Sequence, residues 1–285
     1  FTAYATQQLL SVSLSFQRAL MVSLTSVARA SFFFCILTIR HEPDLGPRQP
    51  HILLILADDL GYNELGFRQN KYSPVNKFAR RTTPHKVDTP NIDRLAGEGV
   101  VLDRYYVQSL CTPSRAALIT GRYPFRYGLA PWVIDSSQVF GLPASETTIA
   151  EVLSSAGYST HMIGKWHLGH ADPRFTPTFR GFQSFLGYLG SHQDYFAHAH
   201  EGAIDFHASG LDARGEPLPR VMEYSGTYST EVFINRTKLV VSQHDPSKPL
   251  FLYLALQSIH SMYVGAPQRL LTRYHKRAQG DKRKQ

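Results

Sequence analysis

An apolar run after residue 50 sets the strongest limit on how this chain folds. Residues 51–57 read His-Ile-Leu-Leu-Ile-Leu-Ala, and only the first of these side chains is polar. A strand with one face in water alternates apolar and polar residues, whereas a continuous apolar run is typical of a strand buried on both faces. Such strands lie at the centre of parallel sheets. The sequence therefore predicts an α/β domain.

Further elements are predicted along the chain from the same kinds of pattern. Residues 158–163 and 250–256 are predicted as strands, the second being another apolar run. Residues 148–156 are predicted as a helix, because apolar side chains recur at i, i+3, i+4 and i+7 and a Thr-x-x-Glu capping box opens the segment. Residues 228–244 are predicted as a second helix, and residues 100–107 as a further strand.

Length and charge limit the function classes that need to be considered. With 285 residues and 43% hydrophobic side chains, the chain is long enough for one large domain with a substantial core. The net charge is +8, and residues 276–285 contribute half of it, with five Lys or Arg against one acid. No nucleic-acid-binding motif occurs in the rest of the chain, so we expect no nucleic-acid partner. The remaining positive charge suits an anionic substrate.

The N-terminal residues 1–48 are interpreted as a leader and linker, and residues 49–285 as the single domain. Residues 31–39 form an apolar stretch that has the length of a signal-peptide core and is too short to span a bilayer. The chain begins with Phe1 and lacks an evident cleavage site, so the sequence leaves open whether this stretch is a leader. The sequon at residues 235–237 (Asn-Arg-Thr) is compatible with a glycoprotein. We expect a lysosomal or extracellular protein without a membrane span.

The chain has two cysteines, Cys35 and Cys111, which excludes a disulfide-dense scaffold. The second begins the sequence Cys-Thr-Pro-Ser-Arg at residues 111–115, just upstream of an apolar, helix-like run. A helix N-terminus with Pro113 in its first turn and Gly121 as its stop explains this spacing without any chemistry. The alternative is a functional cysteine motif.

Two further motifs favour the functional alternative. Residues 164–169 (Gly-Lys-Trp-His-Leu-Gly) follow a predicted strand and place Lys165 and His167 two residues apart, on the same side of an extended segment. Asp58 and Asp59 come directly after the first buried strand, and ligand sites of open α/β sheets lie at the carboxyl ends of the strands. Paired carboxylates there either cap a turn or bind a divalent cation.

Together, these motifs resemble the sulfatase family. The resemblance extends from Pro50 to the last residue and is closest to the arylsulfatase B-like branch, on residues 123–129 and 159–163. It implies an alkaline-phosphatase-like fold, in which a mixed, largely parallel sheet is flanked by helices. It also implies a sulfuric ester hydrolase that acts on sulfated small molecules or glycans.

The resemblance assigns roles to particular residues. A formylglycine-generating enzyme oxidises the motif cysteine of this family to formylglycine, whose hydrate is the nucleophile. The implied catalytic residues are Cys111, Arg115, Lys165, His167 and His260. Within this set, Lys165 and His260 would hold sulfate oxygens and His167 would assist release of sulfate. One Ca²⁺ would be bound by Asp58, Asp59 and the nucleophile at position 111.

The chain departs from the family pattern at its C-terminal end. Family members carry an Asp-Asn pair and a further lysine downstream, and this chain contains no Asp-Asn dipeptide. We interpret the domain as C-terminally truncated, because residues 265–285 resemble the connector towards that part. Three functions stay open: a sulfatase, an inactive remnant lacking those metal ligands, and a phosphatase or phosphodiesterase of the same superfamily. The third is disfavoured because those enzymes typically use Ser or Thr as nucleophile.

Two other segments carry weaker signals. Residues 179–190 are rich in glycine and aromatic side chains, which we interpret as aromatic packing. A loose histidine run follows, which consists of His192, His198, His200 and His207. We interpret it as a solvated loop rather than a metal cluster, because the spacing is irregular and no cysteine is near.

Overall fold

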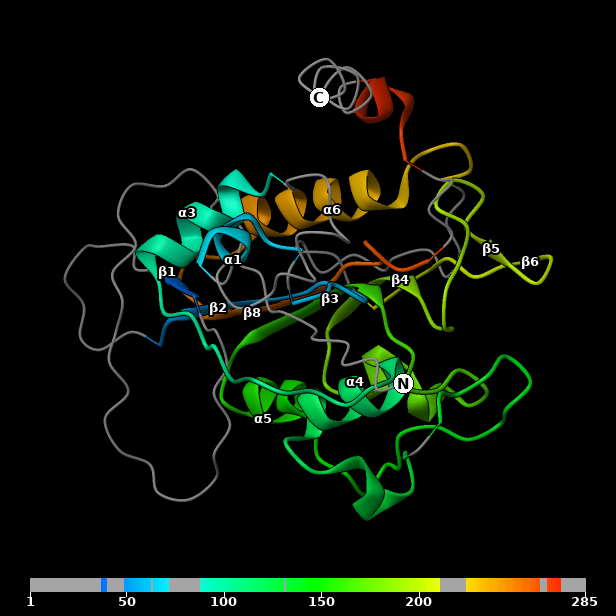
Figure 1. Cartoon of the computed structure of the whole chain (residues 1–285). Helices are drawn as coiled ribbons and strands as arrows, with labels where there is room; N and C mark the ends of the chain where they lie inside the picture. The colour runs from blue at the N-terminus through cyan, green and yellow to red at the C-terminus, as the bar shows by residue number, and fades with distance from the viewer. Residues whose placement is uncertain are drawn as a thin grey trace.

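A six-stranded sheet forms the centre of the fold, with the strand order β1-β2-β8-β3-β4-β7 (Figure 1). The computed structural model describes residues 37–39, 49–62, 64–71, 88–130, 132–210, 224–261 and 266–272. The four central strands run parallel to one another: β2 (His51–Leu56), β8 (Leu250–Ala255), β3 (Ser159–Lys165) and β4 (Ser184–Tyr188). The edge strands pair antiparallel with them: β1 (Leu37–Ile39) and β7 (His207–Gly210). The predicted mixed, largely parallel sheet is confirmed.

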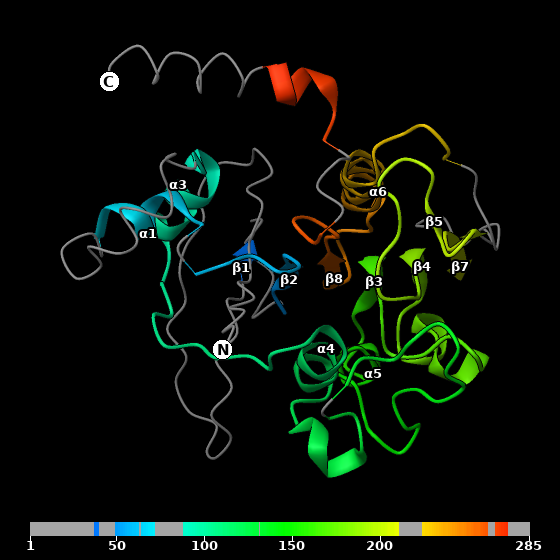
Figure 2. The same cartoon turned by 45° about the vertical axis from the view of Figure 1, so that its right-hand side comes forward.

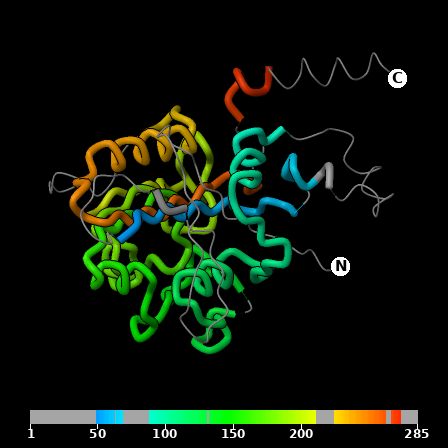
Figure 3. The backbone as a smooth tube through the Cα atoms, turned by 90° about the vertical axis from the view of Figure 1, so that its left-hand side faces the viewer, coloured from blue at the N-terminus to red at the C-terminus, as the bar shows by residue number. Residues whose placement is uncertain are grey.

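The two apolar runs of the sequence lie next to each other at the middle of this sheet. β2 and β8 pair in register from Ile52 opposite Phe251 to Leu56 opposite Ala255. They run side by side through the centre of the molecule although they are far apart in the chain (Figure 3). The strands predicted over residues 51–57, 158–163 and 250–256 are therefore confirmed.

Helices cover both faces of the sheet (Figures 1 and 2). α6 (Ser229–Gln243) lies on one face, and α4 (Cys111–Thr120) and α5 (Ile149–Ser155) lie on the other. Successive side chains of a strand point to opposite faces, so each central strand contributes to two cores. The core below α6 includes Leu53, Ile55, Leu252, Leu254 and Phe233. The core against α4 includes Leu54, Leu56, Phe251, Tyr253 and Ala116.

The predicted helices begin and end where the sequence places them. Thr148 caps α5 through the predicted capping box: its Oγ1 accepts from the Glu151 amide, and the Glu151 carboxylate accepts from the Thr148 amide at 2.7 Å. Gly157 follows with φ 87°, a conformation that glycine adopts without strain. α6 matches the helix predicted over residues 228–244.

Smaller elements join these layers. The short helices are α1 (Gly66–Lys71), α3 (Pro90–Glu98), η1 (Pro124–Tyr127), η2 (Pro173–Phe175) and η3 (Pro177–Phe179). A two-stranded hairpin stands apart from the main sheet: β5 (Ala199–His200) and β6 (Ala203–Ile204). In the part of the chain that the structure describes, no helix is long and apolar enough to cross a membrane.

The strand predicted over residues 100–107 is wrong. This segment runs without regular structure from α3 to α4, outside the sheet (Figure 2). Val and Tyr favour strands because they pack well on a partly buried sheet surface. Val100 and Tyr106 are exposed, so this packing is absent here. The edge of β2 that could have accepted another strand is paired with β1 instead.

Two further segments contain strands that the sequence did not predict. β4 lies inside the aromatic stretch at residues 179–190, where no strand was expected, although the expected packing is present as Phe182 stacks against Phe251 and Tyr253. β1 consists of residues that the sequence places in the leader. The rest of residues 1–48 lies outside the described residues, Cys35 included.

Candidate functional site

The predicted site residues meet at one edge of the sheet, where the parallel strands end. Asp58 and Asp59 follow β2, and His260 follows β8. Lys165 is the last residue of β3, and His167 comes two residues later. The carboxyl ends of parallel strands share one edge of a sheet, which explains why residues from three strands converge.

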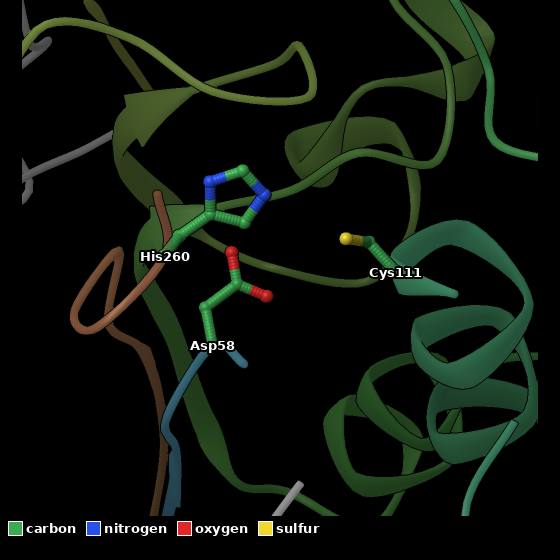
Figure 4. Close-up of side chains that lie close together, drawn as sticks. All are labelled: Asp58, Cys111 and His260. Atoms are coloured by element: carbon green, nitrogen blue, oxygen red, sulfur yellow. The ribbon is translucent and has the colours of Figure 1, made fainter. Parts of the chain in front are cut away.

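Asp58, Cys111 and His260 form the centre of this arrangement (Figure 4). One ligand atom of each, a carboxylate oxygen, the thiol sulfur and a ring nitrogen, lie within 4.8 Å of one another. Two backbone bonds bring His260 beside Asp58: the Asp58 amide donates to the Ser258 carbonyl at 2.9 Å, and the Ile259 amide donates to the Asp58 carbonyl at 2.8 Å. The thiol points towards both side chains from the start of α4.

The helix predicted after the cysteine motif positions the thiol. α4 begins at Cys111 and ends before Gly121, which has φ 67°. Thr112 attaches its first turn to the sheet edge, because its Oγ1 donates to the His167 carbonyl at 3.0 Å and accepts from the Ile134 amide at 3.1 Å. Cys111 is half-buried and is not in a disulfide.

The carboxylate of Asp58 is shared by two buried cations. Arg115 donates from Nη2 to Oδ1 at 3.0 Å, and Lys165 donates from Nζ to Oδ2 at 2.7 Å. All three side chains are at most 1% exposed. Burial alone would raise the pKa of Asp58, but attraction to Arg115 and Lys165 and the hydrogen bond from Lys165 outweigh it and hold the pKa below its usual range. Asp58 is therefore ionised.

Arg115 also fixes the position of Lys165. Its Nη1 donates to the backbone carbonyl of Lys165 at 2.8 Å. Arg115 lies one helical turn beyond Cys111, so it faces the same side of α4, as predicted. One guanidinium thus connects α4 with the ends of β2 and β3.

His167 is buried and neutral. Its Nε2 donates to the Ile134 carbonyl at 2.9 Å. Burial, and then the charge of Lys165, lowers its pKa well below the usual range. Because a neutral imidazole carries one proton, Nδ1 holds a lone pair. This atom is buried and has no hydrogen-bond partner among the residues described.

Asp59 lies on the solvent-exposed side of the central group. Its side chain is 43% exposed, and its Oδ2 is 3.5 Å from Nε2 of His260. The backbone has a left-handed φ of 59° at Asp59. The two adjacent carboxylates therefore differ in burial, and His260 rather than Asp59 completes the three-residue group.

The histidine run contains residues that the sequence did not assign to the site. The interpretation as a solvated loop is wrong for His198, which is buried and stacks on Phe206. His192 and His200 are half-buried, and the His192 ring is 5.9 Å from that of His260. His192 follows the end of β4 much as His167 follows β3, but this signal was hidden because β4 was not predicted.

Comparison with known proteins identifies the family. The sulfatase family model matches residues 50–285. Arylsulfatase J of Mus musculus is 38% identical over 229 residues, covering 80% of this chain and 35% of the relative. N-acetylgalactosamine-6-sulfatase of Mus musculus is 33% identical over 249 residues, covering 79% of this chain and 43% of the relative. The chain thus spans less than half the length of these relatives.

The fold comparison agrees with this assignment. The crystal structure of the PsFucS1 sulfatase from Pseudoalteromonas sp. matches with a TM-score of 0.60 at 28% identity, covering 78% of this chain and 46% of that one. The predicted alkaline-phosphatase-like fold is confirmed by this likeness and by the mixed sheet between two helix layers. The chain belongs to the sulfatase family.

Proposed function

We propose that this protein hydrolyses sulfate monoesters, those of sulfated sugars in particular, with a nucleophile made from Cys111. The observation that carries the proposal is the group of Cys111, Asp58 and His260 within 4.8 Å, beside the buried cations that pair with Asp58. Hydrolysis of a sulfate ester develops negative charge on the sulfuryl oxygens and on the leaving oxygen. Sugar esters are favoured by the likeness to N-acetylgalactosamine-6-sulfatase.

The surroundings of Cys111 fit conversion to formylglycine. Pro113 and Arg115 stand at the two motif positions that a formylglycine-generating enzyme recognises in this family, and the thiol is not in a disulfide. The hydrated aldehyde would supply a nucleophilic oxygen where the structure has Sγ. In the group of Asp58, Cys111 and His260, the sulfur of Cys111 therefore stands in for that oxygen.

The donor set also contains the kind of ligand that Ca²⁺ prefers, which is oxygen. Asp58 is ionised and Asp59 is an exposed carboxylate beside it, and the modified residue 111 would add an oxygen. Calcium takes about six to eight oxygen ligands, so these residues would supply part of its shell. Arg115 and Lys165 each bond one oxygen of Asp58, so the cation would share this carboxylate with them. When bound, the cation would polarise the ester and the nucleophile.

The other residues would bind sulfate and move a proton. Lys165 has three N–H donors, and its bond to Asp58 uses one, which leaves donors for sulfate oxygens. His260 lies beside Asp58, opposite the Cys111 sulfur (Figure 4). The lone pair on Nδ1 of His167 would accept the proton of the remaining hydroxyl of residue 111. The C–O bond to the sulfate would then break, so that the aldehyde re-forms and sulfate leaves.

We further propose that the protein enters the secretory pathway and is lysosomal or extracellular. The sequon supports this proposal, because Asn235 is exposed on α6. Thr237 is buried there and donates to the Phe233 carbonyl at 2.9 Å. The asparagine side chain is thus the accessible part of the sequon.

The test is turnover of a chromogenic aryl sulfate by the full-length protein, expressed with a formylglycine-generating enzyme. We expect hydrolysis in proportion to the formylglycine content and none in Cys111→Ala. Hydrolysis of an aryl phosphate in place of the sulfate would favour the phosphatase alternative. Full formylglycine content without hydrolysis of aryl or sugar sulfates would refute the proposal and favour a non-catalytic family member.

A further inference from the structure

Three histidine rings form a cluster beside the candidate site. The ring of His192 is 4.1 Å from that of His200 and 5.9 Å from that of His260, and the second pair is nearly parallel, with an angle of 15°. We call His192, His200 and His260 the histidine cluster. They come from the loop after β4, from β5 and from the loop after β8. The proposed reaction uses only His260.

The position of His192 is fixed by its neighbours. Asp205 accepts hydrogen bonds from the amides of Leu189 and Gly190, at 3.0 and 2.8 Å, and so holds the backbone just before the histidine. Ser191 Oγ lies 2.9 Å from Nδ1 of His192 and orients the ring. If the hydroxyl donates this bond, a neutral His192 carries its proton on Nε2. That nitrogen is then a hydrogen-bond donor towards a ligand.

The segment that carries His200 is hydrogen-bonded to the loop that contacts Thr112 and His167. Glu201, the next residue, accepts a hydrogen bond from Ser136 Oγ at 2.6 Å. Ser136 lies two residues after Ile134, which contacts both Thr112 and His167. The β5–β6 hairpin is therefore connected to the same loop that supports the catalytic group.

The charges around the cluster favour an anion. Burial lowers the pKa of His192, and the charges of His200, His260 and Lys165 lower it further, whereas Glu201 acts in the opposite direction. Two carboxylates face the cluster, Glu201 near His200 and Asp59 near His260. Glu201 is bonded to Ser136, and Asp59 is a proposed cation ligand. The imidazole N–H groups of the cluster and the ammonium of Lys165 can then donate hydrogen bonds to the oxygens of an anion.

We propose that His192 and His200 form a second anion-binding subsite, which binds another sulfate or a carboxylate of the same substrate molecule while the scissile sulfate lies at Cys111. This inference rests on the proposed function, because it takes the substrate to be a sulfated sugar. The subsite selects sugars with two anionic groups over those with one. His192 and His200 are thereby specificity-determining residues.

The test measures binding rather than turnover, so it stands apart from the test of activity. Calorimetry on full-length Cys111→Ala compares three disaccharides of one backbone: one monosulfated, one disulfated, and one carrying a single sulfate and a uronate carboxylate. We expect the doubly anionic ligands to bind about tenfold more tightly than the monosulfated one, the effect of one charge-assisted hydrogen bond. His192→Ala and His200→Ala should each remove most of this preference. Which of the two doubly anionic ligands gains affinity identifies the second group as sulfate or carboxylate.

The matched control is His244→Ala. This histidine contacts the His51 ring edge to face at the opposite end of β2 and should leave the preference unchanged. His192→Asn retains a hydrogen-bond donor and should keep part of the preference, which shows that the substituted protein still folds. Equal affinity for all three disaccharides in the parent protein, or an unchanged preference in both alanine variants, would overturn the subsite. Full formylglycine content without turnover of aryl or sugar sulfates in the unsubstituted protein would refute the proposed function alone.

Discussion

Lys165 and Asp58 form an ion pair with no solvent-exposed surface on either side chain, at 2.7 Å between Nζ and Oδ2. Arg115 shares the same carboxylate, so one buried anion balances two buried cations. Removal of one member of a buried pair leaves an uncompensated charge in a medium that solvates it poorly. This relationship makes Asp58 a structural residue as well as a proposed cation ligand.

Asp58→Asn should therefore lower the free energy of unfolding by about 3–5 kcal/mol, as measured by urea denaturation. Asp59→Asn is the matched control, because that side chain is 43% exposed and should change stability by no more than about 0.5 kcal/mol. Equal losses in the two variants would show that the ion pairs of Asp58 contribute little.

Ca²⁺ affinity should fall in both of these variants, although only Asp58→Asn should lose much stability. Each substitution removes a proposed anionic oxygen ligand, so both should weaken Ca²⁺ binding by at least about tenfold in calorimetry on the full-length protein. Unchanged affinity in Asp59→Asn would assign the cation to the group of Asp58, Cys111 and His260 without Asp59.

Cys111 should be converted to formylglycine when the protein is expressed with the generating enzyme. Peptide mass spectrometry should find the aldehyde at position 111, and Pro113→Ala should lower the converted fraction because it removes a motif residue. Ser114→Ala, at the intervening position, is the control and should be converted as efficiently as the parent. A thiol alone in the parent protein would contradict the assignment of the motif.

His161 should make the fold sensitive to acid. Burial, and then the charges of His244 and Arg236, lowers its pKa from 6.5 to about 4. The unfolded chain takes up the proton first, so the free energy of unfolding is constant above neutral pH and falls as the pH drops from 6.5 towards 4. At pH 5 the loss from this group is about 2 kcal/mol.

The measurement is chemical denaturation of the parent and of His161→Gln at pH 7 and pH 5. The variant lacks the titrating group and should lose less stability between the two values. It should also keep a hydrogen bond to Ser184, whose Oγ lies 2.6 Å from Nδ1 of His161. An identical loss in both proteins would place the acid sensitivity elsewhere.

Patterns contained in one short segment could be predicted from the sequence. β2 and β8 are continuous apolar runs, and α5 has its capping box within four residues. Cys111 and Lys165 lie in motifs of a few residues each. Each of these signals is local, so no knowledge of the folded neighbours is needed.

What could not be predicted depends on contacts between distant segments. β4 includes Gly187, a residue type that strands usually avoid. It is required there because a Cβ on Gly187 would lie 2.0 Å from the carbonyl oxygen of Gly164 on the neighbouring strand. The approach of His192 to His260 likewise follows from the order of β8, β3 and β4, which the linear sequence does not contain.

The insertion of β8 between β2 and β3 has a consequence for synthesis of the protein. β8 is the last main-sheet strand of the described chain to leave the ribosome, and several seconds of translation separate it from β3. During that interval β2 has no parallel partner, and the residues that enclose the thiol from the far side are not yet made. The proposed modification would therefore have access to Cys111 on an open nascent segment before His260 arrives beside it.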